Sequence, residues 1–323
     1  MKVAYLGRDS SQEHSGRLCG PQRLGTELEK RMRTHLQTHL LFSGDPAASL
    51  PRMILSIRKN KIKVMHAHGS INSGLWLLLL KRFVKSKAIL TFTDFKKNVT
   101  NNYKILNGLD AVIVMDEFAR KKLIDEGVKR DKVHLVPYGV EDSFYNAKQS
   151  AVVRKMAKKI ILYYGDARME RGFHLILRSL QHIKDDTLVL LCVRNFHEGF
   201  SKEGVEKFIS RYKNVKLWTV KDYPCSIHDL VKSVDLVLLP FIKNTLEPPL
   251  TLLEVSAAGK PLVTFNIGGN REVVSPGSVV LDRKDHLQIA EAVNDFRPGK
   301  REQKRIFYNW DETVRKIREI YDK

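Results

Sequence analysis

The sequence predicts an α/β fold of two doubly wound, Rossmann-like domains in tandem, and three observations support this prediction. The chain has 323 residues, which is more than one typical hydrophobic core needs. Short apolar runs suited to buried strands alternate with stretches of helical spacing. The alternation starts again near residue 150. We therefore expect a first domain over residues 1–148 and a second over residues 149–306.

The first half contains five apolar runs that we interpret as strands of one parallel sheet. They cover residues 2–7, 62–69, 88–93, 111–116 and 133–140. Apolar and charged residues recur at helical spacing over 21–40, and an apolar helix is predicted over 74–85. Because these runs are apolar throughout, we expect helices on both faces of the sheet.

The second half repeats this organisation. Its five apolar runs cover residues 159–165, 187–193, 215–220, 235–240 and 261–265. A helix is predicted over 251–258, with Pro248 or Pro249 at its first position and Gly259 closing it. The charged tail predicts a last helix over 307–323, with an apolar stripe that needs a surface to pack against: Phe307, Trp310, Val314, Ile317 and Tyr321.

The composition indicates a basic, globular protein. Its net charge is +20, and residues 1–148 carry 26 Lys and Arg against 14 Asp and Glu. Such a charge attracts nucleic acid, anionic lipid or phosphorylated small molecules, and does not choose among them. The basic residues are spread over many helices without a known nucleic-acid-binding module, so we expect no nucleic-acid partner. Three scattered cysteines, no apolar run long enough for a membrane span and no secretory signal predict a cytoplasmic protein.

The stretch "YYGDARMERG" (163–172) is a candidate diphosphate site. Gly165 ends a strand and Gly172 precedes a helix, and glycines let a backbone approach a ligand. Arg168 and Arg171 add charged, forked donors that suit phosphate. An ordinary strand–helix turn with exposed arginines explains this stretch equally well.

The stretch "LEPPLTLLE" (246–254) places one carboxylate before a predicted helix and one inside it. Seven helical steps from Glu247 to Glu254 span about 10 Å, comparable to the reach from the sugar to the ribose of a nucleotide sugar. The alternative is that Glu247 interacts favourably with the helix dipole and that Glu254 is simply solvated. Glu254 lies between apolar residues, where a charge needs a partner, and this favours a functional role.

A longer pattern resembles a known family. "DLVKSVDLVLLPFIKNTLEPPLTLLEVSAAGKPLVTFNIGGNREVV" (229–274) resembles the donor domain of retaining GT-B glycosyltransferases (family 4-like, glycosyl transferases group 1). "GVKRDKVHLVPYGVEDSF" (127–144) resembles the segment that closes the first domain of that family, and "MKVAYLG" and "MHAHG" its opening strands. The resemblance implies a GT-B fold, with an active-site cleft between two Rossmann-like domains and a last helix that packs back on the first.

The resemblance also implies roles for individual residues. Glu254 would hold the ribose hydroxyls of the donor, Glu247 would contact the transferred sugar, and Arg171 would pair with the diphosphate. The base would meet the backbone near Val220. The whole donor-binding set that we expect is Gly165, Arg168, Arg171, Val220, Leu250, Thr251 and Glu254.

The sequence departs from the family pattern at several positions. Six residues separate the two glutamates where the family has seven, and Pro248 and Pro249 lack the amide donors that often touch the sugar. Asp166 stands where the family has arginine, and an uncompensated carboxylate there would repel a diphosphate. Asp94 follows Thr93 where the family often has histidine, and His68 is expected nearby. Our candidate catalytic residues are therefore Glu247, His68 and Asp94, although His68 also fits a satisfied histidine at a strand end.

The acceptor is expected to meet the first domain. Polar and glycine residues after the first strand are candidates to border it: Arg8, His14, Gly16 and Arg17. Basic residues near Trp76, Phe83 and Phe95 suggest a face that docks on an anionic membrane, with a plain solvated surface as the alternative.

The resemblance implies a hexosyltransferase that retains anomeric configuration and uses neither a metal nor another cofactor. It would move a sugar from a nucleoside-diphosphate sugar to a glycan, a polysaccharide precursor or a lipid-linked acceptor, at the cytoplasmic face of a membrane. The alternatives are a basic nucleic-acid-binding protein, a GT-B sugar-nucleotide epimerase, and an inactive GT-B scaffold.

Overall fold

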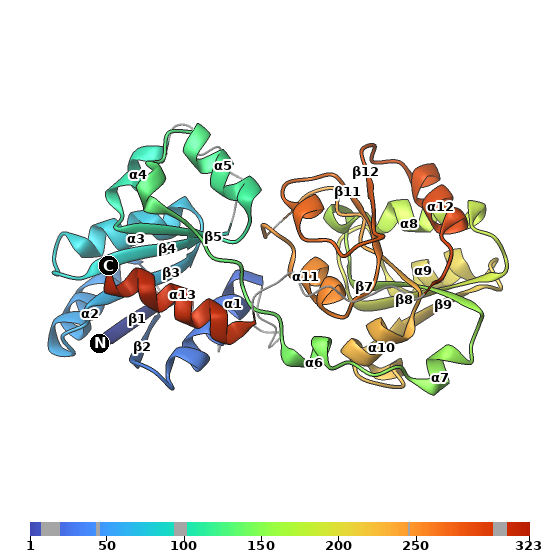
Figure 1. Ribbon diagram of the computed structural model, residues 1–323, viewed down its shortest axis with the longest axis horizontal. Coiled ribbons are helices and arrows are strands. Elements are labelled where there is room, and N and C mark those ends of the chain that lie inside the picture. Colours follow the sequence, from blue (N-terminus) through green and yellow to red (C-terminus); the bar gives the residue numbers. More distant parts are fainter. Residues whose placement is uncertain (8–19, 43–45, 94–101, 245, 300–308) are drawn as a thin grey trace. The chain divides into compact units, whose positions relative to one another are not determined.

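The computed structural model describes residues 1–7, 20–42, 46–93, 102–244, 246–299 and 309–323. The chain divides into two compact units, which are described separately (Figure 1). Unit 1 comprises Met1–Gly139, the short segment 245–247 and the C-terminal residues 308–323. Unit 2 comprises Val140–Asn244 and residues 248–307.

Unit 1 is built on a six-stranded parallel sheet with the order β2-β1-β3-β4-β5-β6. The order reverses beside β1, which is the switch point typical of a doubly wound sheet. Its main elements are β1 (Lys2–Gly7), α1 (Gly20–Met32), β2 (Gln37–Phe42), α2 (Pro46–Lys59), β3 (Val64–Gly69), α3 (Ile71–Lys81), β4 (Lys87–Phe92), α4 (Tyr103–Gly108), β5 (Ala111–Val114), α5 (Glu117–Asp125), β6 (Val133–Leu135) and α13 (Trp310–Asp322).

Both faces of this sheet are covered by helices. Helices α2, α3, α4 and α5 bury their apolar residues in one core cluster with strand residues such as Met65 and Leu90. Helix α1 contacts β1 and β3 and also packs against α13. Several helices begin at a side-chain cap, as at Asp116, which accepts a hydrogen bond from the Ala119 N–H at 2.7 Å.

Unit 2 repeats the architecture with a parallel sheet of order β12-β11-β10-β7-β8-β9. The strand order reverses between β7 and β10. Its main elements are α6 (Asp142–Tyr145), α7 (Ala151–Arg154), β7 (Lys159–Ala167), η3 (Met169–Arg171), α8 (Phe173–Ser179), β8 (Thr187–Phe196), α9 (Lys202–Ile209), β9 (Val215–Thr219), η5 (Val220–Asp222), α10 (Ile227–Ser233), β10 (Leu236–Leu238), α11 (Leu250–Ala257), β11 (Leu262–Phe265), β12 (Val279–Leu281) and α12 (His286–Asp295).

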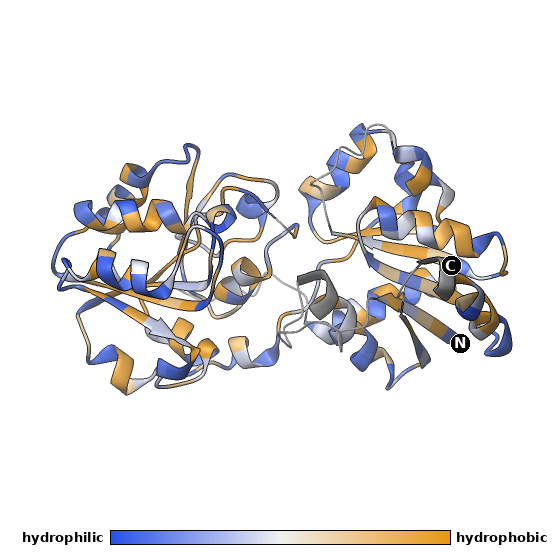
Figure 2. Ribbon diagram, turned by 180° about the vertical axis from the view of Figure 1, so that it is seen from behind, coloured by the Kyte–Doolittle hydropathy of each residue, from blue (hydrophilic) through white to orange (hydrophobic). Residues whose placement is uncertain are grey.

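Alternate residues of β7 serve two separate cores. Ile160, Leu162 and Tyr164 belong to the cluster that includes α10 and α11. Ile161 and Tyr163 point into the opposite cluster, with α8 and α12. Figure 2 shows the strands of each unit as largely hydrophobic ribbons, as expected for parallel sheets that helices cover on both faces.

Two parallel sheets with helices on both faces confirm the predicted α/β, doubly wound fold. The structure corrects the prediction at the edges of the sheets. Residues 37–42, mostly assigned to a helix from the sequence, form edge strand β2, and edge strand β12 was not predicted. Edge strands are less buried than central ones, so their apolar pattern is weaker.

The boundary between the units also differs from the predicted one. Unit 1 gives way to unit 2 at Gly139, and not at residue 148. The reason is burial, since Val140 and Phe144 already lie in a core cluster of unit 2. The last helix begins at Trp310 and belongs to unit 1.

Candidate functional site

The carboxyl end of β7 in unit 2 brings Gly165 and Arg171 together. Gly165 has φ +137°, and a Cβ built on it would lie 2.2 Å from Nη1 of Arg171. Glycine therefore makes room for the guanidinium. The Arg171 guanidinium also lies 5.1 Å from the ring centroid of Phe241. Its buried Nη1 has no hydrogen-bond partner among the described residues. Buried hydrogen-bond donors normally have a partner, so this nitrogen marks a place where a ligand could supply a hydrogen-bond acceptor.

Gly172 fixes the turn after β7 against the end of β10. It has φ +71°, in the left-handed region, and a Cβ there would lie 2.0 Å from the Pro240 carbonyl oxygen. The amides of Ile242 and Lys243 donate to the Glu170 carbonyl oxygen, at 2.9 and 3.2 Å. These contacts hold the turn beside the switch point, where ligands bind in doubly wound sheets.

Helix α11 supplies Glu254 and Thr251 to the same end of the sheet. The Tyr164 hydroxyl lies 3.1 Å from Oε2 of Glu254 and 3.2 Å from the Thr251 carbonyl oxygen, so one phenol ties β7 to α11. Glu254 is only 8% exposed. The buried Thr251 Oγ1 has no partner among the described residues. Leu250 is the first residue of this helix, and no side chain caps it.

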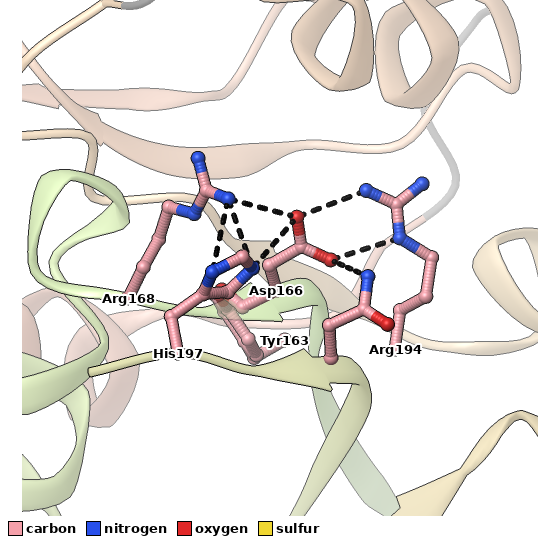
Figure 3. Close-up of polar contacts among 6 residues, drawn as sticks. Tyr163, Asp166, Arg168, Arg194 and His197 are labelled. Atoms are coloured by element: carbon pink, nitrogen blue, oxygen red, sulfur yellow. Dashed lines mark hydrogen bonds and ion pairs between the residues drawn. The ribbon is translucent and has the colours of Figure 1, made fainter. Parts of the chain in front are cut away.

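Asp166 is surrounded by positive and polar side chains (Figure 3). Nε and Nη2 of Arg194 donate to its two carboxylate oxygens at 2.8 and 3.0 Å, and Nδ2 of Asn195 donates at 2.9 Å. Arg168 lies 3.6 Å from Oδ2 and donates to Nε2 of His197 at 2.9 Å. Burial alone would raise the pKa of Asp166, but the hydrogen bonds and charge of Arg194 outweigh it and lower that pKa to about 2. The sequence left open whether the charge of Asp166 is compensated, and the structure pairs its carboxylate with Arg194.

Val220, expected near the nucleotide base, begins turn η5 directly after β9. Its side chain is exposed and lies at the carboxyl end of the sheet. The turn is fixed by Asp222, whose Oδ2 accepts from the amide and the hydroxyl of Thr219 at 2.7 and 2.8 Å.

The candidate catalytic residue Glu247 belongs to unit 1 by its contacts, whereas Glu254 belongs to unit 2. Glu247 is 5% exposed, and its amide donates to the Thr93 carbonyl oxygen at 3.4 Å. Thr93 follows β4. Helix α11 begins only at Leu250, so the six residues between the glutamates do not form one helix.

His68 ends a chain of polar side chains inside unit 1. Its Nε2 makes a very short hydrogen bond with the Tyr138 hydroxyl. That hydroxyl lies 3.1 Å from Thr91 Oγ1, which lies 2.8 Å from Nε2 of His66. Burial lowers the pKa of His68 to about 3, so its imidazole is neutral near pH 7. The Nε2 atom of this strand-end histidine therefore has its partner inside unit 1.

The chain continues from His66 to the C-terminal helix. Nδ1 of His66 lies 2.6 Å from the Tyr321 hydroxyl, which lies 2.9 Å from the Tyr5 hydroxyl. Tyr321 belongs to α13, so this polar contact fixes the last helix on the sheet. Burial and the nearby His68 lower the pKa of His66 well below its usual range.

The remaining candidates lie outside the described residues: Arg8, His14, Gly16, Arg17 and Asp94. The structure thus brings together Gly165, Arg168, Arg171, Thr251 and Glu254 in unit 2. It adds residues that the sequence did not single out: Tyr164, Arg194, Asn195 and His197. The signal for the last three was their position directly after an apolar run, where a parallel strand presents its ligand-binding end.

Within the described part of the chain, no three His, Cys, Asp or Glu side chains are grouped so that they could hold a metal ion.

Two family models match the chain. The model described as glycosyl transferases group 1 matches residues 145–313, and the model described as glycosyltransferase family 4 matches residues 17–144. Spore coat protein SA of Bacillus subtilis (strain 168) is 24% identical over 187 residues, covering 51% of this chain and 49% of that protein. The matched segment thus spans about half the length of the curated relative.

Solved structures share the fold. Anabaena Alr3699/HepE, solved in complex with UDP-glucose, superposes with a TM-score of 0.70 at 14% identity and covers 91% of this chain and 89% of its own. A UDP-GlcNAc 2-epimerase of Methanocaldococcus jannaschii has a TM-score of 0.63 at 15% identity and covers both chains fully. At these identities the likeness shows the two-domain GT-B fold alone.

Proposed function

This chain belongs to the glycosyl transferases group 1 family, and from that premise we propose that it transfers a sugar from a nucleoside-diphosphate sugar to an acceptor hydroxyl. The observation that carries the proposal is the buried Nη1 of Arg171, which lies against Gly165 without a protein partner among the described residues. A diphosphate oxygen would satisfy this donor and match its charge.

The proposed donor lies along the carboxyl ends of β7 and β10 in unit 2. Arg171 and Arg168 would contact the diphosphate, and Glu254, held by Tyr164, would accept hydrogen bonds from the ribose hydroxyls. Leu250 and Thr251 would border the donor at the start of α11, and the backbone around Val220 would meet the base. The likeness to the UDP-glucose complex makes uracil the first base to test.

We propose a reaction that needs no metal ion. The acceptor oxygen would attack the anomeric carbon from the face that the diphosphate leaves, so the configuration is retained. The bond from that carbon to the diphosphate oxygen breaks, and the leaving phosphate takes the proton of the acceptor hydroxyl. Arg168 and Arg171 would stabilise the charge that develops on the leaving group, which lowers the barrier. Glu247 would position the sugar and stabilise charge, without acting as a nucleophile.

Replacing Glu254 with alanine is expected to weaken binding of the donor about tenfold or more, because hydrogen bonds to a charged acceptor are lost. Replacing Glu247 with alanine should mainly lower kcat. Isothermal titration calorimetry with the nucleotide, followed by turnover assays, measures both effects. Unchanged donor affinity in the Glu254→Ala protein would refute the ribose contact.

The control for this experiment is Glu291→Ala, which removes an exposed carboxylate from α12 of the same unit. The donor is first found by a thermal-shift screen against uridine, guanosine and adenosine diphosphates and their sugars, since a ligand that binds the folded state raises Tm. Analysis of the products then separates transfer from epimerisation of the nucleotide sugar, and the absence of nucleotide binding would favour an inactive scaffold.

The acceptor is proposed to bind unit 1, with His68 and Asp94 near it. Tyr138 holds His68, whose imidazole is neutral near pH 7. A neutral imidazole can exchange hydrogen bonds with an acceptor hydroxyl without adding charge.

An anionic membrane is the partner that the surface of unit 1 suits best. Residues 46–93 contain nine Lys and Arg and no Asp or Glu. Arg58 donates from Nη2 to the Phe83 carbonyl oxygen at 2.8 Å, which brings the end of α2 beside the end of α3. The basic patch so formed carries cations and two exposed apolar side chains: Arg52, Leu55, Arg58, Lys59, Arg82 and Phe83. Cations attract acidic headgroups, and apolar side chains insert between them. No helix in the described part of the chain has the length and apolar content to span a bilayer.

The double variant Leu55→Ser/Phe83→Ser is expected to lower binding to vesicles that contain phosphatidylglycerol several-fold, because two inserting side chains are lost. Flotation at modest salt measures binding, and phosphatidylcholine vesicles should not bind either protein. Leu287→Ser, at an exposed leucine of α12, is the matched control. The membrane proposal would be wrong if the native protein did not float with anionic vesicles, or if it bound RNA and not the vesicles.

A further inference from the structure

The carboxylate of Asp166 forms ion pairs with arginines at the ends of two neighbouring strands of unit 2. Strands β7 and β8 are parallel neighbours, with Gly165 paired to Val193. The residues that follow this pair, Asp166 and Arg194, therefore meet at the carboxyl edge of the sheet. Figure 3 shows Asp166 between Arg194 on one side and the Arg168–His197 pair on the other.

The geometry of the Asp166–Arg194 pair fixes the guanidinium plane. Two nitrogens of one guanidinium bond two oxygens of one carboxylate, at 2.8 and 3.0 Å, and Asn195 holds one of those oxygens as well. Such bidentate pairs restrict orientation as well as distance. Asp166 is 6% exposed, whereas the Arg194 side chain is 46% exposed. The carboxylate is thus anchored, and the guanidinium that it orients remains accessible to a ligand.

Several cationic side chains lie close to Asp166. Three guanidinium groups act on this carboxylate, those of Arg168, Arg171 and Arg194. Guanidinium groups gathered in this way at one edge of a sheet would attract an anion such as a diphosphate.

We propose that Arg194 is a third arginine of the diphosphate site and that Asp166 is its positioning residue. This inference rests on the proposed function, because it assigns residues to the same donor. It explains how a carboxylate can stand next to Gly165 without repelling the ligand. Asp166 stays ionised, its negative charge is offset by Arg194 and Arg168, and its two bonds to Arg194 hold that guanidinium at the carboxyl edge of the sheet.

The test compares Asp166→Asn, Arg194→Ala and Arg194→Lys with the native protein, using uridine diphosphate, uridine monophosphate and uridine as calorimetric probes, or the corresponding series of the base selected by the screen. Arg194→Ala should weaken diphosphate binding about tenfold while leaving the nucleoside unchanged, and Arg194→Lys should recover part of the loss. Arg211→Ala, at an exposed arginine of the same unit, is the control.

The sign of the Asp166→Asn effect decides between positioning and plain electrostatics. Removing a negative charge would by itself strengthen binding of an anion, whereas loss of the positioned guanidinium weakens it. We expect about fivefold weaker diphosphate binding, and less than additive losses in the double variant Asp166→Asn/Arg194→Ala.

Tighter or unchanged binding in Asp166→Asn would overturn the positioning role. Equal losses for nucleoside and diphosphate in Arg194→Ala would overturn the diphosphate contact, while leaving the proposed function in place. If the native protein bound none of the nucleotides in the screen, the proposed function would fail first, and this inference with it.

Discussion

Replacing Gly172 with alanine is expected to destabilise unit 2 by about 3 kcal/mol or more and to disrupt the proposed donor site. The residue has φ +71°, and a left-handed backbone costs alanine about 1–2 kcal/mol. The larger contribution is steric, because the new Cβ would lie 2.0 Å from the Pro240 carbonyl oxygen, which belongs to the backbone and cannot rotate away. The turn that carries Arg171 would have to move. Urea unfolding followed by nucleotide titration measures both consequences.

Gly199 provides a matched control for this substitution. It also has a positive φ, +85°, but a Cβ built on it meets nothing within 4 Å. Gly199→Ala should therefore cost only the backbone strain, about 1–2 kcal/mol. If the two variants lost the same stability, the close approach of Gly172 to Pro240 would not be the rigid contact described above.

Replacing Tyr321 with phenylalanine is expected to cost about 2–4 kcal/mol in unit 1, because the change leaves two buried groups without their partner. The Tyr321 hydroxyl lies 2.6 Å from Nδ1 of His66 and 2.9 Å from the Tyr5 hydroxyl. No water can replace it without a rearrangement of α13, since Tyr321 is 1% exposed. The helix should then open more often.

Amide hydrogen exchange is the measurement of choice, since it reports α13 and the strands of unit 1 separately from unit 2. Faster exchange is expected in α13 and β3, and little change in β7 or β8. Tyr103→Phe, at a half-buried tyrosine of the same unit, is the control. Uniform acceleration in both units, or none in α13, would show that the polar chain does not fix the helix.

Much of the proposed donor site could be predicted from local sequence. A strand end, a turn and a helix point to Gly165, Arg171 and Glu254, and the structure places Arg171 against Gly165 and bonds Glu254 to the neighbouring Tyr164. The central strands were also predicted, because strands buried on both faces are nearly continuous apolar runs. Two of the four edge strands, β6 and β9, were also predicted, whereas β2 and β12 were not, because their partly exposed residues give only a weak apolar pattern.

The state of Asp166 could not be predicted in this way. From the sequence it was a charge at odds with a diphosphate, because its partner Arg194 is 28 residues away and belongs to the next strand. Tyr164 is a similar case, since its contact with Glu254 spans 90 residues. Glu247 also differs from expectation, because its amide bonds unit 1 while its motif partner Glu254 lies in unit 2.

The sequence by itself determined the order of the strands other than β2 and β12, the division into two doubly wound sheets and the strand ends at which functional residues are expected. Those features depend on local periodicity and on glycine and proline, which act over a few residues. Only the tertiary structure decided which side chains far apart in the sequence meet: Arg194 with Asp166 between two strands, and Tyr164 with Glu254 and Tyr321 with His66 between a strand and a helix. The physical reason is that a parallel neighbour is joined through a long crossover, so its register, and with it each charge partner, is set by packing of the whole unit.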